Sequence, residues 1–351
     1  MKSDIFNIRI LFGIGKLLGV TPLWMHRSKV LSKVYISFLI LLVTFGTFLS
    51  VKKRYMALSE LDMSIDQAFL ESSECFTEML FMLSCFLGVI RRNEAWGELF
   101  HNFVRAEEQL RGIDFNDHGH LCVFGVRLIV INVAFFAVHA YEIIIWEEVH
   151  EFSIEYGYIL YRISMYYQFF TVYVVVCLAE MLKKRYAFLN KLVERTLKER
   201  SKVIVISTKD SRRVLDKLTK IQRIYTVLHN AVQNINAIFG WTLFFYFSTF
   251  VMNILVNINY VLRYTQTENV DLNLKILATY VSYSVVYTIS TISIVMSCDE
   301  VDRSGKTIVK TCFLHQKVLE RPSIKDEVIF FARIMKELAP TFSAAGFFPI
   351  N

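Results

Sequence analysis

The stretch YGYILYRISMYYQFFTVYVVVCLAEML, residues 156–182, decides the fold class of this chain. It carries one Arg and one Glu, and its apolar residues do not alternate with a period of two. About 20 helical residues cross the roughly 30 Å of bilayer hydrocarbon, and a helix satisfies its own backbone where water is absent. The stretch therefore predicts a membrane-spanning α-helix.

Five further runs have the same character, in a chain that is 54% apolar. They cover residues 34–51, 67–90, 121–146, 235–262 and 274–297. Together the six runs predict an all-α polytopic membrane bundle. A shorter run over residues 5–24 is interrupted by Arg9 and Lys16 and lacks a small-residue cleavage site, so it predicts an amphipathic lead-in on the cytosolic side.

The distribution of Lys and Arg predicts the orientation of the bundle. The N-terminal segment, the second and fourth loops and the C-terminal region hold 32 of these residues, whereas the opposite side holds five. Cytosolic segments carry the excess of Lys and Arg, so the N-terminus is expected in the cytosol. This bias accounts for the net charge of +7 without a nucleic-acid partner.

The cytosolic segments themselves have a helical pattern. In the loop 183–234 the helix of the fourth span continues, breaks near residues 202–210 and resumes with an apolar stripe at three- and four-residue spacing. A further helix is expected between Ser323 and Pro340. The expected organisation is a lead-in (1–33), a six-span bundle with its helical loop (34–297) and a C-terminal region (298–351).

Polar residues within the spans are candidates for a ligand site, because charges are costly in the membrane and usually face the bundle interior. Those in the outer halves of the second, third and fourth spans have similar depth and suit a small hydrogen-bonding ligand. The candidates are Glu71, Glu74, Glu78, His139, Glu142, Tyr161, Arg162, Tyr166, Tyr167 and Gln168.

Structural roles compete with this interpretation. Residues near the outer ends can reach the headgroups, and an Arg–Glu contact between Arg162 and Glu142 can simply join two helices. The many hydroxyl residues of the sixth span, from Thr279 to Ser293, are expected mainly to bond backbone carbonyls one turn earlier or a neighbouring helix.

Other protein classes fit the sequence less well. A G-protein-coupled receptor requires an external N-terminus, and a transporter typically shows inverted repeats or broken spans. An enzyme is not expected, since His118 and His120 form the one close histidine pair without the further ligands of a metal centre. No disulfide, metal or cofactor is expected, because no pair of cysteines faces the oxidising side.

Two quoted segments carry a family resemblance. KLLGVTPLW (Lys16–Trp24) lies in the lead-in, and FSAAGFF (Phe342–Phe348) follows the last predicted helix. With six spans, an internal N-terminus and a long cytosolic loop, the chain resembles the insect gustatory receptor family, and the related odorant receptors are the alternative. The sharpest motif residues are Phe342, Ser343, Gly346, Phe347 and Phe348.

The resemblance implies a subunit of a tetrameric, ligand-gated cation channel in the plasma membrane. It implies a tastant site in the outer half of the bundle, cytosolic helices that join subunits, and a seventh helix lining the pore. The motif of that seventh helix has no match before Asn351. The chain is therefore expected to lack the pore helix and, expressed alone, to conduct no current.

Overall fold

The computed structural model describes residues 4–22, 29–59, 65–113, 121–150, 156–201, 208–264, 270–316 and 322–350. Within these ranges the chain is helical apart from a short hairpin near the end. Each predicted span lies inside one of six long helices. These are α2 (Lys29–Ser59), α3 (Ile65–Arg91), α5 (Leu121–His150), α6 (Tyr156–Ser201), α7 (Thr208–Tyr264) and α8 (Val270–Gln316). The predicted all-α membrane bundle is confirmed.

Three shorter helices and one hairpin complete the described chain. They are α1 (Asp4–Leu18), α4 (Asn93–Arg111), α9 (Pro322–Glu337) and the strands β1 (Ser343–Ala344) and β2 (Phe348–Pro349). The lead-in helix α1 was expected. The helix expected between Ser323 and Pro340 ends at Glu337, because the residues before a proline avoid helical geometry.

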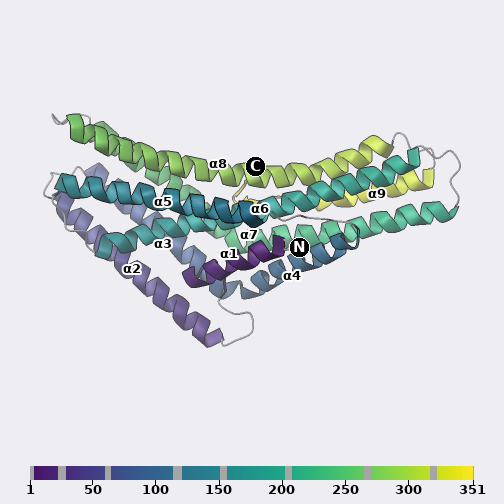
Figure 1. The fold of residues 1–351 in the computed structure, drawn as a ribbon, viewed down its shortest axis with the longest axis horizontal. Helices are drawn as coiled ribbons and strands as arrows, with labels where there is room; N and C mark the ends of the chain where they lie inside the picture. The colour runs from purple at the N-terminus through teal and green to yellow at the C-terminus, as the bar shows by residue number, and fades with distance from the viewer. Residues whose placement is uncertain are drawn as a thin grey trace.

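Hydropathy separates the long helices into two groups. Stretches in α3, α6, α7 and α8 are long and apolar enough to cross a membrane, whereas α2 and α5 contribute the shorter apolar stretches Lys33–Leu49 and Leu128–Tyr141. Helices α6, α7 and α8 extend well past their predicted apolar runs, whereas α3 ends with its run. Figure 1 shows α6, α7 and α8 following the long axis of the molecule, with α9 beside the later half of α8.

We call the region formed by α4, α9 and residues 183–234 and 298–316 the stem, and the region formed by the predicted spans the bundle. The stem is tightly packed. Its apolar stripe on α7 was predicted from spacing and is fully buried, as confirmed at Val214, Leu218, Ile221, Tyr225, Leu228 and Val232.

Helix α4 was not predicted, although Trp96, Leu99 and Phe103 are buried at helical spacing.

Helix α6 forms the centre of the molecule. Within the apolar stretch Met165–Lys198, 83% of the most apolar 18-residue segment is buried. A helix that is apolar on all sides has no face suited to water and is stable where other helices surround it. Helices α2, α7 and α8 pack along it, which explains why the stretch that decided the fold class also organises the bundle.

The C-terminal motif folds back onto α7. Ala345 and Gly346 have φ of 53° and 81°, the left-handed values that a tight hairpin turn requires, and glycine adopts them without strain. The amide of Asn236 donates to the carbonyl of Thr341 (2.8 Å) and accepts from the N–H of Ser343 (3.1 Å). Phe342 is buried, and Phe347 packs its ring on Phe244. The side chain of Phe348 lies outside the described part.

Candidate functional site

A cavity lies inside the bundle where four helices meet. It is lined by Phe135, Val138 and His139 of α5, Met165, Gln168 and Phe169 of α6, Tyr246 of α7, and Tyr283, Val286, Tyr287 and Ser290 of α8. Aromatic rings form most of its wall, and a small number of polar groups interrupt them. This combination is typical of small-molecule sites, where apolar surface provides affinity and a few polar groups fix orientation.

His139 joins α5 to α8 at the wall of the cavity. Its Nδ1 lies 2.6 Å from the hydroxyl of Tyr283, and its ring packs edge-on against Phe135 with centroids 4.1 Å apart. The partner roles in the hydrogen bond depend on the tautomer of the imidazole. The pair therefore offers a ligand either a donor or an acceptor, according to the proton that His139 carries.

Gln168 is the unusual polar group of the cavity. Its side chain is 1% exposed, and neither its amide nitrogen nor its amide oxygen hydrogen-bonds with another described group. A buried polar group without a partner costs about 1–3 kcal/mol, so folded proteins rarely keep one without a function. A ligand carrying both a donor and an acceptor would satisfy this amide.

The cavity is small in this structure, at about 30 Å³. Ligand pockets for drug-sized molecules have volumes of roughly 300–1,000 Å³. The site is therefore closed, and a ligand must displace side chains to enter. The walls suit such a change, because Met165 is a flexible side chain and Phe135, Phe169 and Tyr166 pack through ring edges and tilted faces.

A separate polar network connects α3, α7 and α8. The amide of Asn253 donates to the carboxylate of Glu74 (2.9 Å). Asn257 donates in turn to Asn253 (2.9 Å) and to the hydroxyl of Ser284 (2.9 Å). Glu74, Asn253 and Asn257 are all buried, so the network holds three helices together through mutually satisfied groups.

The sequence candidates divide among these features. His139 and Gln168 line the cavity, and Tyr166 lies beside it, where its hydroxyl donates to Asn132 (2.8 Å). Glu74 belongs to the polar network, and Glu78 is buried on the same helix without lining the cavity. Tyr167 packs its ring on Phe86. The side chains of Glu71, Glu142, Tyr161 and Arg162 lie outside the part that the structure describes.

The hydroxyl residues of α8 also divide. Thr279, Ser282 and Ser293 donate to carbonyls one turn earlier, as expected. Tyr283, Tyr287 and Ser290 line the cavity instead. Sequence reasoning grouped all of these and missed Asn253 and Asn257 entirely, although two asparagines one turn apart in an apolar run indicate a buried polar contact.

Small-molecule sites commonly lie between the helices of a bundle, as this cavity does. The family model for 7tm chemosensory receptors matches residues 8–351. The chain belongs to this family, and it is therefore a chemosensory receptor and not an enzyme.

Solved structures agree on the fold. The structure of olfactory receptor OR5 of the insect Machilis hrabei in complex with eugenol has a TM-score of 0.56 and 14% sequence identity, and the match covers 99% of this chain and 94% of that one. A second structure of the same receptor has a TM-score of 0.51 and 13% identity, with the same coverage of both chains. A search of curated proteins returned no match.

Proposed function

We propose that this chain is a gustatory receptor subunit of a ligand-gated cation channel, and that it binds a small tastant in the cavity between α5, α6, α7 and α8. The tastant is aromatic or alicyclic and carries hydroxyl or amide groups. Its apolar part displaces the side chains around Met165, and its polar part bonds to Gln168 and to the His139–Tyr283 pair.

The observation that carries this proposal is the buried amide of Gln168, which has no hydrogen-bond partner among the described residues. A ligand at this amide supplies the missing hydrogen bonds, each of which contributes about 0.5–1.5 kcal/mol. Ligands that lack a matching donor and acceptor leave the amide unsatisfied and are rejected.

The test is a ligand screen on the purified chain in lipid nanodiscs, with sugars, bitter alkaloids and amino acids measured by direct binding. A hit is then compared between the unchanged chain, Gln168→Leu and the control Ser282→Ala, whose hydroxyl bonds to its own helix. We expect Gln168→Leu to weaken binding at least tenfold and Ser282→Ala to leave it unchanged. Equal binding by all three proteins would place the ligand elsewhere.

An odorant receptor subunit is the second candidate function. The fold likeness to olfactory receptor OR5, one structure of which contains eugenol, favours it. The two functions differ in the compounds that bind. Volatile phenols such as eugenol should compete for the site of an odorant receptor, whereas soluble sugars, alkaloids or amino acids should bind a gustatory receptor.

The proposed orientation places the N-terminus and the stem in the cytosol and the cavity toward the outer face of the plasma membrane. The charge bias of the loops supports it. A peptide tag at Met1 should be stained by antibody only after the cells are permeabilised. Staining of intact cells would reverse the orientation.

We also propose assembly into tetramers with identical or related subunits, on the strength of the family resemblance. Native mass spectrometry of the detergent-purified protein should show a four-subunit species. The contact proposed between Glu142 and Arg162 is tested separately by a double-mutant cycle on surface expression, in which strictly additive effects would mean that the residues do not interact.

A further inference from the structure

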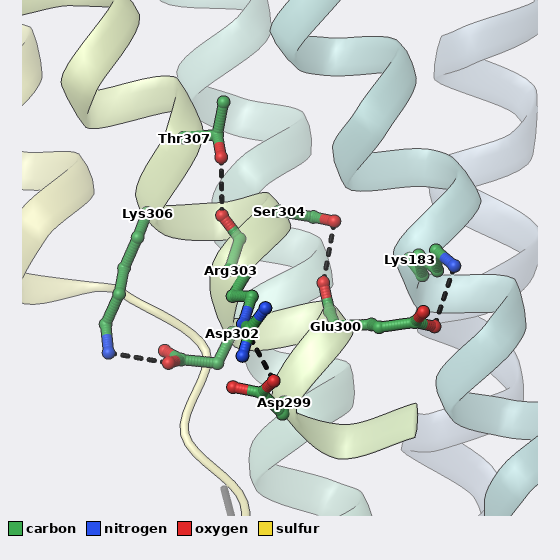
Figure 2. Close-up of polar contacts among 8 residues, drawn as sticks. All are labelled: Lys183, Asp299, Glu300, Asp302, Arg303, Ser304, Lys306 and Thr307. Atoms are coloured by element: carbon green, nitrogen blue, oxygen red, sulfur yellow. Dashed lines mark hydrogen bonds and ion pairs between the residues drawn. The ribbon is translucent and has the colours of Figure 1, made fainter. Parts of the chain in front are cut away.

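Helix α8 is held differently along its two halves. In the stem, one side of the helix is completely buried at helical spacing, with 0% exposure at Cys298, Val301, Ile308 and Cys312. Figure 2 shows a further contact at the start of this half, where Lys183 of α6 binds Glu300 of α8 (2.7 Å). In the bundle, α8 instead faces the cavity through Tyr283 and Tyr287. Side chains that border a cavity lack packing partners on that side, so the bundle half is held less firmly.

Two consecutive residues join the bundle half of α8 to different helices. The hydroxyl of Tyr283 lies 2.6 Å from Nδ1 of His139 on α5, and the hydroxyl of Ser284 accepts from the amide of Asn257 on α7 (2.9 Å). Asn253 accepts a second hydrogen bond from the same amide (2.9 Å), which fixes the side chain of Asn257. Consecutive residues of a helix point about 100° apart, so the two contacts lie on different sides of α8. Helix α8 is thus held between α5 and α7 at the level of the cavity.

The contact with α7 is the one that opposes a large ligand. The proposed ligand lies between Gln168 of α6 and the pair formed by His139 and Tyr283, and it bonds to both. The pair therefore moves as a unit when a compound enters the closed cavity of about 30 Å³. Because α6 and α7 both contribute to the wall, enlarging the cavity on the side of α8 moves α8 away from both of them.

The firmly held stem defines the pivot of this movement. Ser284 lies sixteen residues before Glu300, which is about 24 Å along the helix. A tilt of about 5° therefore displaces Ser284 by about 2 Å, enough to break its 2.9 Å hydrogen bond with Asn257. Another contact between α7 and α8, from the hydroxyl of Tyr246 to that of Thr291, is 3.3 Å long and lies nearer the pivot. The same tilt separates that pair less.

We propose that the hydrogen bond between Asn257 and Ser284 limits the size of the ligand that the cavity accepts. A short compound enters when the side chains around Met165 move, and it leaves the bond intact. A longer compound must tilt α8 and break the bond, which weakens its binding. The inference rests on the proposed ligand site, and it makes Asn257 and Ser284 positioning residues that act on the ligand through Tyr283.

Opening of the cavity can be measured without a ligand, through the reaction of a cysteine at position 165 with N-ethylmaleimide. Met165 is 6% exposed and lines the cavity from the central helix α6. In the full chain carrying Met165→Cys, reconstituted in lipid nanodiscs, Ser284→Ala should raise the labelling rate about two- to tenfold, the factor that corresponds to one hydrogen bond.

Two matched variants serve as controls for the labelling rate. Ser282→Ala removes a hydroxyl that bonds to a carbonyl of its own helix, and Ser284→Thr keeps the hydroxyl that Asn257 binds. Neither should raise the rate. Equal labelling in Ser284→Ala and in both controls, with every protein eluting as folded material by size exclusion, would overturn the inference.

Two primary carboxamides test the size limit itself, because each offers a donor and an acceptor to the amide of Gln168. Benzamide is short, and biphenyl-4-carboxamide is one ring longer. Ser284→Ala should strengthen binding of the longer compound about two- to tenfold and leave binding of benzamide unchanged. Equal strengthening of both compounds, or weaker binding of both, would show that the bond supports the site as a whole and would overturn the size limit.

A variant of the partner residue shows whether the hydroxyl of Ser284 acts through Asn257. Adding Ser284→Ala to Asn257→Leu should give no further rise in the labelling rate, because the bond is already absent. A further rise equal to that of Ser284→Ala alone would overturn the assigned contact. Absence of carboxamide binding by all of these proteins would contradict the proposed ligand site, whereas the labelling rates decide the inference on their own.

Discussion

Gln168 and Arg185 lie seventeen positions apart on α6, and both are buried. Their polar groups differ in hydrogen bonding. Arg185, in the stem, donates to Glu107 of α4 (3.0 Å) and to the carbonyl of Met181 (2.9 Å), and it lies over the ring of Phe103. Gln168, in the bundle, has no such partner among the described residues. The same helix thus carries a hydrogen-bonded buried charge in the stem and, in the bundle, a buried amide without a partner among the described residues.

This contrast indicates a division of labour along one helix. A buried ion pair makes its surroundings intolerant of movement, because separating the partners strands a charge. A closed cavity walled by Met165 and tilted rings permits movement at little cost. We therefore propose that the stem stays fixed while a bound ligand changes the side-chain packing of the bundle.

The largest expected effect comes from removing the buried ion pair between Glu107 and Arg185 in the stem. Glu107→Leu leaves Arg185 buried beside an apolar group, which should lower the free energy of unfolding by about 3–5 kcal/mol. Thermal unfolding monitored by size exclusion would show this loss. The double variant Glu107→Leu with Arg185→Met should recover most of the stability. Arg111→Gln is the control. The side chain of Arg111 is 59% exposed and pairs with the same carboxylate, Glu107, at the surface, so it should contribute less than about 1 kcal/mol to the free energy of unfolding.

A smaller effect is expected where the C-terminal segment docks on α8. A Cβ on Gly305 would lie 2.6 Å from Cγ of Pro340, so Gly305→Ala forces the turn after α9 away from its seat. Overpacking of this kind costs about 1–3 kcal/mol. The hairpin should also become cleavable by protease. Gly13→Ala is the matched control, because nothing lies within 4 Å of its Cβ and the helix should be unchanged or slightly more stable.

In the bundle, removing a buried polar group should raise the free energy of unfolding instead of lowering it. Gln168→Leu removes an unsatisfied amide from an apolar setting and should stabilise the folded chain by about 1–3 kcal/mol while it weakens ligand binding at least tenfold. A gain in melting temperature together with a loss of affinity distinguishes a binding site from a structural residue. A loss of stability would show that Gln168 supports the fold, as Arg185 does.

The smallest effects are expected on the outer face of α8. Ser282 and Ser293 bond to carbonyls of their own helix at 2.7 and 2.8 Å, so neither hydroxyl links two helices. Changing either to Ala should alter stability by less than about 0.5 kcal/mol. A larger change would mean that this face contacts another subunit, and chemical crosslinking at these positions would identify the contact.

Periodicity and charge predicted most of the fold, because both are properties of continuous segments. The apolar stripe on α7 could be predicted directly from spacing. Of the break predicted near residues 202–210, residues 202–207 lie outside the described part of the chain, and residues 208–210 already belong to α7. Helix α4 was not predicted despite an equally regular pattern at Trp96, Leu99 and Phe103, because its many charged residues are also typical of an irregular cytosolic loop.

The candidate site was less predictable, because it depends on which faces of four helices meet. Sequence placed His139 and Gln168 among the polar residues of the spans, but it did not separate them from Glu74, whose partner Asn253 lies 179 residues away. Nor did it identify Phe135 or Met165, since an apolar residue in an apolar helix carries no local sign of a cavity. Such contacts are defined by tertiary packing alone.

The most direct test of the binding site is a cryo-electron microscopy structure of the chain with the strongest compound from the ligand screen. We expect ligand density between α5, α6, α7 and α8, with a polar atom of the compound about 2.7–3.2 Å from the amide of Gln168. The stem around Arg185 and Glu107 should be unchanged. Ligand density outside this cavity, or within it but with the Gln168 amide still without a partner, would contradict the proposed site.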